Sequence, residues 1–149
     1  MKTNTITEDY IPYKRCFVCG AENPIGLHIE KFVMEEEVCC LFQVGENNCG
    51  YPGILHGGIT AAIADELMGD AANLELALAV TVSISVKYES PGFVGETLLC
   101  KGWVVRREEG HAWTRAVLTN QQSGRTVAVA EGEYFKISPE RLSKNSFSL

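Results

Sequence analysis

The chain has 149 residues, of which 46% are hydrophobic and 21% charged, a balance typical of one globular domain rather than of a disordered, collagen-like or coiled-coil chain. Its 13 basic and 19 acidic residues give a net charge of −6, which argues against a nucleic-acid or anionic-membrane partner. No stretch reaches the roughly 18 apolar residues of a membrane span. The N-terminal residues carry no secretory signal, so we expect a cytoplasmic protein with reduced thiols.

The first third of the chain predicts two strands and a loop. Residues 16–26 are rich in turn formers. Residues 27–33 and 38–44 are predicted to be strands joined by a hairpin turn. Residues 47–58, with the sequence NNCGYPGILHGG, form a Gly- and Pro-rich loop of the kind that carries functional groups.

Residues 58–74 are predicted to form the long helix. At about 100° per residue, one broad face of this helix gathers small and apolar side chains, so another layer is expected to pack closely on it. The members of this face are Thr60, Ala61, Ala64, Leu67, Met68, Ala71 and Ala72. Glu66, Asp70 and Asn73 gather on the opposite, polar side.

Four further strands are predicted, at residues 80–88, 97–107, 112–120 and 126–136. The first alternates strictly between apolar and polar residues, which predicts a half-buried strand. Turn-forming residues separate the four, so they are predicted to form an antiparallel meander. The last strand has small residues on one side, where a helix could lie: Ala128, Ala130 and Gly132.

These elements predict a single α+β domain over residues 1–149, in which residues 1–15 and 138–149 are peripheral tails. One helix cannot cover both faces of a six-stranded sheet. The uncovered face and the sheet edges need a partner, so we expect the chain to form a dimer.

The sequence His56-Gly57-Gly58 stands at the predicted start of the helix. The first N–H groups of a helix have no intrahelical partner, and the helix dipole there favours negative charge. Gly57 and Gly58 therefore describe an oxyanion or anion site. A tight turn without any further role is the alternative interpretation of the two glycines. His56 either polarises a carbonyl or ties the loop down.

Asp65 lies about two turns into the predicted helix, among small apolar helical neighbours. Its carboxylate is therefore expected beside a hollow, where partial desolvation would make it a better base. A solvated helix carboxylate is the alternative. Glu66 points about 100° away, toward Asp70, and is interpreted on residue chemistry as a surface or interface group.

Cys16 and Cys19 have the spacing of metal ligands. A structural zinc site needs four ligands, and the sequence offers no second pair. Only the fold could bring further ligands close, and these would be Cys39, Cys40, Cys49 or His28. The sequence therefore predicts no metal site, and we interpret the two thiols as structural.

Taken together, these motifs resemble a known family. They are CFVCG, NPIGL, GYPGILHGG, the Asp65-Glu66 pair nine and ten residues after His56, VKYESP and SGRTVAVAEGEYF. Their order and spacing resemble the hotdog-fold thioesterases of the 4-hydroxybenzoyl-CoA thioesterase superfamily, and within it the PaaI-like branch. The resemblance covers roughly residues 16–137.

The resemblance implies a hotdog fold, in which a curved antiparallel sheet of about six strands wraps a long central helix. It implies hydrolysis of acyl-CoA thioesters to free acid and CoA, without a cofactor other than the coenzyme A of the substrate. It also implies a homodimer or a dimer of dimers, with active sites that use both subunits.

The resemblance implies roles for individual residues. Asp65 takes the position of the nucleophile or general base, and the Gly57 N–H polarises the thioester carbonyl. His56 sets the loop, and Thr81 helps to place the water or the base.

Three further residues are expected to contact the substrate: Asn48, Gly58 and Glu66. The chain departs from the family at Gly50, where many members carry Asn or Gln aimed at the nucleophilic water or the carbonyl. Either the loop takes a different path and Asn48 supplies the missing side chain, or no side chain here contacts the nucleophilic water or the carbonyl.

Two other functions stay open at this point. One is a non-catalytic acyl-CoA-binding hotdog module, against which the intact Asp65 argues. The other is a hotdog hydratase or dehydratase, which would need a histidine and a carboxylate on either side of a double bond. No second pair of that kind is visible in the sequence.

Overall fold

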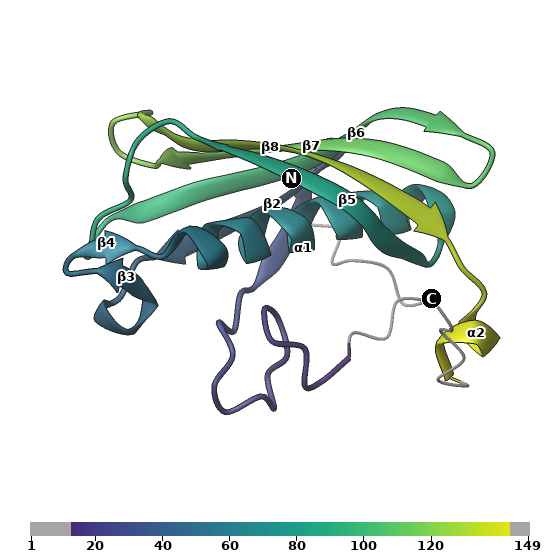
Figure 1. Ribbon diagram of the computed structural model, residues 1–149, viewed down its shortest axis with the longest axis horizontal. Coiled ribbons are helices and arrows are strands. Elements are labelled where there is room, and N and C mark those ends of the chain that lie inside the picture. The colour runs from purple at the N-terminus through teal and green to yellow at the C-terminus, as the bar shows by residue number, and fades with distance from the viewer. Residues whose placement is uncertain (1–12, 144–149) are drawn as a thin grey trace.

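A computed structural model of the chain describes residues 13–143, and most of the two predicted tails lies outside this range (Figure 1). Its main elements are one helix and six strands: α1 (Gly57–Leu76), β1 (Lys31–Met34), β2 (Glu37–Gln43), β5 (Ala79–Tyr88), β6 (Thr97–Glu108), β7 (His111–Asn120) and β8 (Thr126–Lys136). The sequence did not predict the short elements: the 3₁₀ turn η1 (Glu46–Asn48), β3 (Cys49–Tyr51), β4 (Ile54–Leu55) and α2 (Pro139–Ser143). No helix in this part of the chain has the length and apolarity needed to cross a bilayer.

The order of the strands corrects the predicted meander. The sheet runs β1-β2-β6-β7-β8-β5, with antiparallel neighbours throughout. Only β6, β7 and β8 form a meander, and β5 lies at the far edge beside β8, with Ile84 opposite Gly132. The physical reason is the connection over residues 89–96, which is longer than a typical hairpin loop and lets β5 leave its sequence neighbour.

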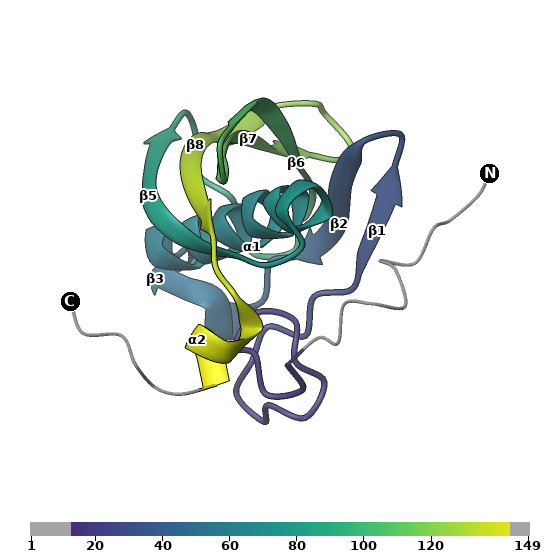
Figure 2. The same ribbon diagram turned by 90° about the vertical axis from the view of Figure 1, so that its right-hand side faces the viewer.

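The sheet curves around α1, which contacts β2, β5, β6, β7 and β8 (Figure 2). This is the predicted α+β hotdog architecture, a long central helix wrapped by a curved antiparallel sheet. The helix approaches the sheet very closely at Gly102 of β6, where a Cβ atom would lie 2.8 Å from the carbonyl carbon of Leu67. Gly102 is thus required by the small distance between the two layers.

The polar side of α1 is partly buried as well, which the sequence did not predict. The predicted small-residue face packs on the sheet, and all its members are buried except the half-buried Ala61. On the other side, Asp70 is only 5% exposed and forms an ion pair with Lys31 of β1. A buried carboxylate requires such a partner, and the sequence pattern of the helix alone could not reveal one on another element.

Strand β5 is more exposed than its alternating pattern predicted. Within the single chain, Val82 is 55% and Ile84 38% exposed, and β5 pairs with β8 only. An edge strand with exposed apolar side chains and unpaired backbone groups is suited to pairing with another strand.

Candidate active site

His56 caps the N-terminus of α1. Its backbone is extended, and its Nδ1 accepts a hydrogen bond of 2.8 Å from the Gly58 N–H. The backbone N–H of His56 donates to the carbonyl oxygen of Asn48 at 2.8 Å. In this structure the imidazole of His56 caps the helix and its backbone N–H holds the preceding loop, as the second of the two sequence interpretations expects.

Gly57 is the one of the two predicted donors that stays available. The His56 ring already occupies the Gly58 N–H. The Gly57 N–H forms no hydrogen bond within residues 13–143, as expected for the first residue of a helix. A backbone donor at the positive end of the helix dipole can stabilise an anionic oxygen.

Tyr88, the last residue of β5, contacts Gly57. Its hydroxyl donates to the Gly57 carbonyl oxygen at 2.6 Å, and its ring packs on Gly57. We infer that Tyr88 positions the peptide units at the helix start. The sequence analysis missed this role, because the alternation of apolar and polar residues identifies Tyr88 only as a large residue of a strand.

Asp65 lies near the middle of α1 and is held by two hydroxyl groups. Its Oδ1 accepts hydrogen bonds from Thr81 Oγ1 at 2.9 Å and from the Tyr134 hydroxyl at 2.8 Å. Its Oδ2 accepts no hydrogen bond from the described part of the chain. One oxygen therefore fixes the orientation of the carboxylate, and the other is available for a water molecule or a substrate.

Tyr134 is a site residue that the sequence analysis missed. Burial, together with the negative charge of Asp65, raises the pKa of its hydroxyl, so Tyr134 stays a neutral hydrogen-bond donor. Its ring fits where glycines leave room, since Cβ atoms at Gly69 and Gly132 would lie 3.4 Å and 2.7 Å from it. The signal was available: Tyr134 continues the period-two series of small residues on the side of β8 that faces the helix.

The loop before the helix gives Asn48 and Gly50 structural roles. The Oδ1 atom of Asn48 accepts a hydrogen bond of 2.9 Å from the Gly45 N–H and thereby closes η1. A Cβ atom at Gly50 would lie 3.1 Å from Cδ2 of His56. The carboxamide oxygen of Asn48 is thus engaged within its own loop.

The predicted residues form two groups rather than one. Asn48, Gly57 and Gly58 gather around His56, whereas Thr81 lies with Asp65. Gly57 and Asp65 are eight residues apart on the same helix, which separates their Cα atoms by about 12 Å along the helix axis. A single thioester carbonyl cannot contact the N–H and the carboxylate of the same chain at once.

Glu66 faces away from both groups. Its Oε1 forms an ion pair with Lys31, whose side chain is only 6% exposed, and its Oε2 lies 3.8 Å from Cys16 Sγ. Burial would lower the pKa of Lys31, but the carboxylates of Asp70 and Glu66 outweigh it and raise that pKa. Within the single chain Glu66 is thus not a solvated surface group, while its place at an interface and its role in substrate binding stay predictions.

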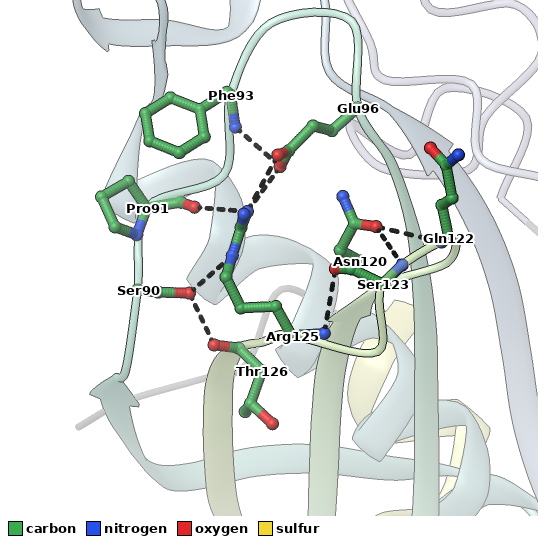
Figure 3. A network of polar contacts seen from close by, with 9 residues as sticks. All are labelled: Ser90, Pro91, Phe93, Glu96, Asn120, Gln122, Ser123, Arg125 and Thr126. Atoms are coloured by element: carbon green, nitrogen blue, oxygen red, sulfur yellow. Dashed lines mark hydrogen bonds and ion pairs between the residues drawn. The ribbon is translucent and has the colours of Figure 1, made fainter.

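A polar network around Arg125 fixes the long connection between β5 and β6 (Figure 3). The guanidinium donates to both carboxylate oxygens of Glu96, at 3.0 Å and 2.7 Å, and to the Pro91 carbonyl at 3.0 Å. Its Nε donates to Ser90 Oγ at 3.1 Å. This connection in turn supports the active-site loop, because the Gly92 carbonyl accepts a hydrogen bond of 2.8 Å from the Leu55 N–H, next to His56.

We expect Arg125→Met to lower the free energy of unfolding at neutral pH by about 1 to 2 kcal/mol. The expected loss is this small because water partly screens the Arg125–Glu96 ion pair. Burial alone would raise the pKa of Glu96, but the hydrogen bond from the Phe93 N–H and the charge of Arg125 outweigh it and lower that pKa. A lowered folded-state pKa stabilises the fold above the ordinary carboxylate range, and this stabilisation is lost as the pH falls through the folded-state value. The variant should therefore lose less stability on acidification than the wild type does.

Denaturant unfolding of both proteins from neutral to acidic pH measures this difference. Arg115→Met is the matched control, because Arg115 forms an exposed ion pair with Glu131 at 2.7 Å. That control should change the free energy of unfolding by less than about 1 kcal/mol. Equal losses in the two variants would contradict a special role of the Arg125 network.

Comparison with known proteins shows the family of the chain. A profile of the thioesterase superfamily matches residues 52–127. Acyl-coenzyme A thioesterase 13 of Homo sapiens is 31% identical over 94 residues, which cover 62% of this chain and 67% of the relative. The chain therefore belongs to the thioesterase superfamily.

Solved structures extend the comparison. The E. coli PaaI protein from the phenylacetic acid degradation operon has a TM-score of 0.70 and 26% identity, covering 75% of this chain and 81% of that protein. A hypothetical thioesterase protein from Streptococcus pneumoniae TIGR4, solved with coenzyme A, has a TM-score of 0.67 and 27% identity, covering 74% and 86%. The chain thus shares its fold with the PaaI protein and with a hypothetical thioesterase.

Proposed function

We propose that the chain hydrolyses acyl-CoA thioesters to free acid and CoA, at sites that two copies of the chain form together. The observation that carries the proposal is the Asp65 carboxylate, which two hydroxyl groups hold through one oxygen while the other stays available. Membership of the thioesterase superfamily, the acyl-CoA thioesterase among the relatives and the coenzyme A complex of a neighbour support the substrate class.

The mechanism follows from the two groups. The Gly57 N–H donates to the thioester carbonyl oxygen and stabilises the negative charge that develops on it. Asp65 acts through Oδ2, either by taking a proton from an attacking water or by attacking the carbonyl carbon itself. In the first route the tetrahedral intermediate collapses, the carbon–sulfur bond breaks, and Asp65 returns its proton to the sulfur, so that the free acid and CoA thiol are released. In the second route CoA leaves as a thiolate that takes a proton from water, and a water molecule then hydrolyses the acyl–aspartyl anhydride to the free acid and restores Asp65.

Two copies are needed because of the distance along α1. The Cα atoms of Gly57 and Asp65 in one chain are separated by about 12 Å along the helix axis, so the two groups at one carbonyl must come from different chains. The free edge of β5, with its exposed Val82, is the surface that we propose joins them into a homodimer, alone or within a dimer of dimers. A monomer in light scattering at micromolar concentration would contradict this arrangement.

A screen of acyl-CoAs from acetyl to palmitoyl, together with several aryl-CoAs, tests the activity by the release of free thiol. We expect at least one of these thioesters to be hydrolysed. Tight binding without any hydrolysis would favour an acyl-CoA-binding module instead. A cytoplasmic location and the lack of a resident cofactor stay predictions from the sequence.

Mixed dimers test whether the site is shared. Asp65→Asn and Gly57→Pro should each be nearly inactive alone, whereas co-refolding the two variants should restore about one quarter of the wild-type activity, because half of the dimers are mixed and one of their two sites is intact. Differently tagged chains allow the mixed dimer to be isolated and assayed. A mixed dimer without recovered activity would show that the two groups act within one chain.

A further inference from the structure

Cys16, Cys19 and Glu66 form a cluster outside the proposed active site. One ligand atom of each residue, two sulfurs and a carboxylate oxygen, lies within 4.8 Å of the other two. All three residues are half-buried, and the cysteines are free thiols. Within residues 13–143 no other group of three cysteine, histidine or acidic residues comes together in this way.

The carboxylate of this cluster is oriented before any ligand binds. Lys31 holds Glu66 through Oε1 and is itself held by Asp70. The other oxygen, Oε2, points at the sulfur of Cys16. A carboxylate that binds a metal through one oxygen is usually fixed through the other by a neighbouring polar group, and Lys31 fills that position.

The loop that carries the two thiols is tightly turned. The Gly20 N–H donates to the Cys16 carbonyl oxygen at 2.9 Å. A Cβ atom at Gly20 would lie 2.4 Å from the Cys16 nitrogen, so only glycine fits at this position. The turn brings both sulfurs to the same side, toward Glu66 on α1.

We propose that Cys16, Cys19 and Glu66 bind a zinc ion, with a water molecule as the fourth ligand. Two sulfurs and one carboxylate oxygen suit Zn²⁺, which accepts S and O ligands in tetrahedral geometry. Binding replaces the two thiol protons by one Zn²⁺, so the net charge of the cluster, with Lys31 and Asp70 included, does not change. The buried ammonium of Lys31 therefore faces no increase in the net positive charge around it.

This site departs from the sequence-based prediction that Cys16 and Cys19 bind no metal. That expectation counted ligands in cysteine and histidine pairs along the chain. The third ligand is a carboxylate 50 residues away, on a helix. In Figures 1 and 2 the segment with both thiols passes below α1, on the side away from the main sheet. The ion would thus fasten this segment to the helix beside Asp65.

Metal analysis of the full chain tests the proposal. The protein is purified from zinc-supplemented cells, its zinc content is measured, and the zinc is then removed with a chelator and replaced by titration with Co²⁺. We expect close to one zinc ion per chain, and the thiolate-to-cobalt charge-transfer absorption of a tetrahedral site. Zinc should also protect both thiols from alkylation, with the modified peptides located by mass spectrometry.

Variants assign the ligands. The double variant Cys16→Ser with Cys19→Ser should lose the zinc and the cobalt absorption, whereas Cys49→Ser, at another half-buried thiol, should keep both. Glu66→Gln leaves the thiols intact and should weaken zinc binding about tenfold or more, which keeps the test valid if the double variant does not fold. A wild-type chain without thiolate–cobalt absorption would overturn the proposal, as would a Cys16–Cys19 disulfide or equal metal loss in Cys49→Ser.

Discussion

Asp65→Asn is expected to lower kcat for thioester hydrolysis by about 10²-fold or more, the usual scale for losing a general base or nucleophile. The asparagine keeps the shape of the side chain, and its amide oxygen can still accept the hydrogen bonds of Thr81 and Tyr134. What it lacks is an anionic oxygen that can take a proton from water or attack the carbonyl. KM should change little, because we expect Asp65 to act on the reacting carbonyl and not to anchor the CoA.

The neighbouring Glu66→Gln is the comparison for this variant. Glu66 faces Lys31 and the thiols rather than Thr81 and Tyr134. We therefore expect a much smaller loss of kcat, together with a lower melting temperature, because Lys31 loses one of its two buried partners. Thermal melts should first show that both variants are folded. An active Asp65→Asn beside an inactive Glu66→Gln would reverse the assignment of the two carboxylates.

The sequence predicted the elements better than their arrangement. A helix over residues 58–74 and six main strands are confirmed, because periodicities of 3.6 and 2 report on local geometry, but the first strand, predicted over residues 27–33, is only Lys31–Met34. The position of β5 beside β8 could not be predicted in this way. Alternation shows which side chains share a face, but it does not show which strand lies next to which.

The candidate site shows the same division between local and distant information. His56, Gly57 and Asp65 were found because they follow one another at fixed spacing along one loop and helix. Tyr134 reaches Asp65 from a strand 69 residues away, and Lys31 reaches Glu66 from another strand. Such contacts depend on the tertiary fold, and a carboxylate by itself does not reveal which hydroxyl or ammonium will hold it.

Gly57→Pro is expected to lower kcat by about 10²- to 10³-fold, the loss seen when one oxyanion donor is removed. Proline suits this position, because it is favoured as the first residue of a helix, where no intrahelical hydrogen bond is lost. The preceding His56 has φ −61° and ψ 131°, the extended conformation that a residue before proline adopts. The substitution therefore removes the N–H of Gly57 while it preserves the backbone.

Gly57→Ala is the control that separates the missing N–H from the added side chain. Alanine keeps the donor, and its Cβ lies 3.4 Å from the Tyr88 hydroxyl, an ordinary van der Waals contact. We expect this variant to retain most of the wild-type kcat. Steady-state kinetics of the two variants, with matching melting temperatures, measure the contribution of the backbone donor. If alanine and proline lowered kcat equally, steric exclusion of the substrate would explain the loss, and the Gly57 N–H would not be the group that stabilises the oxyanion.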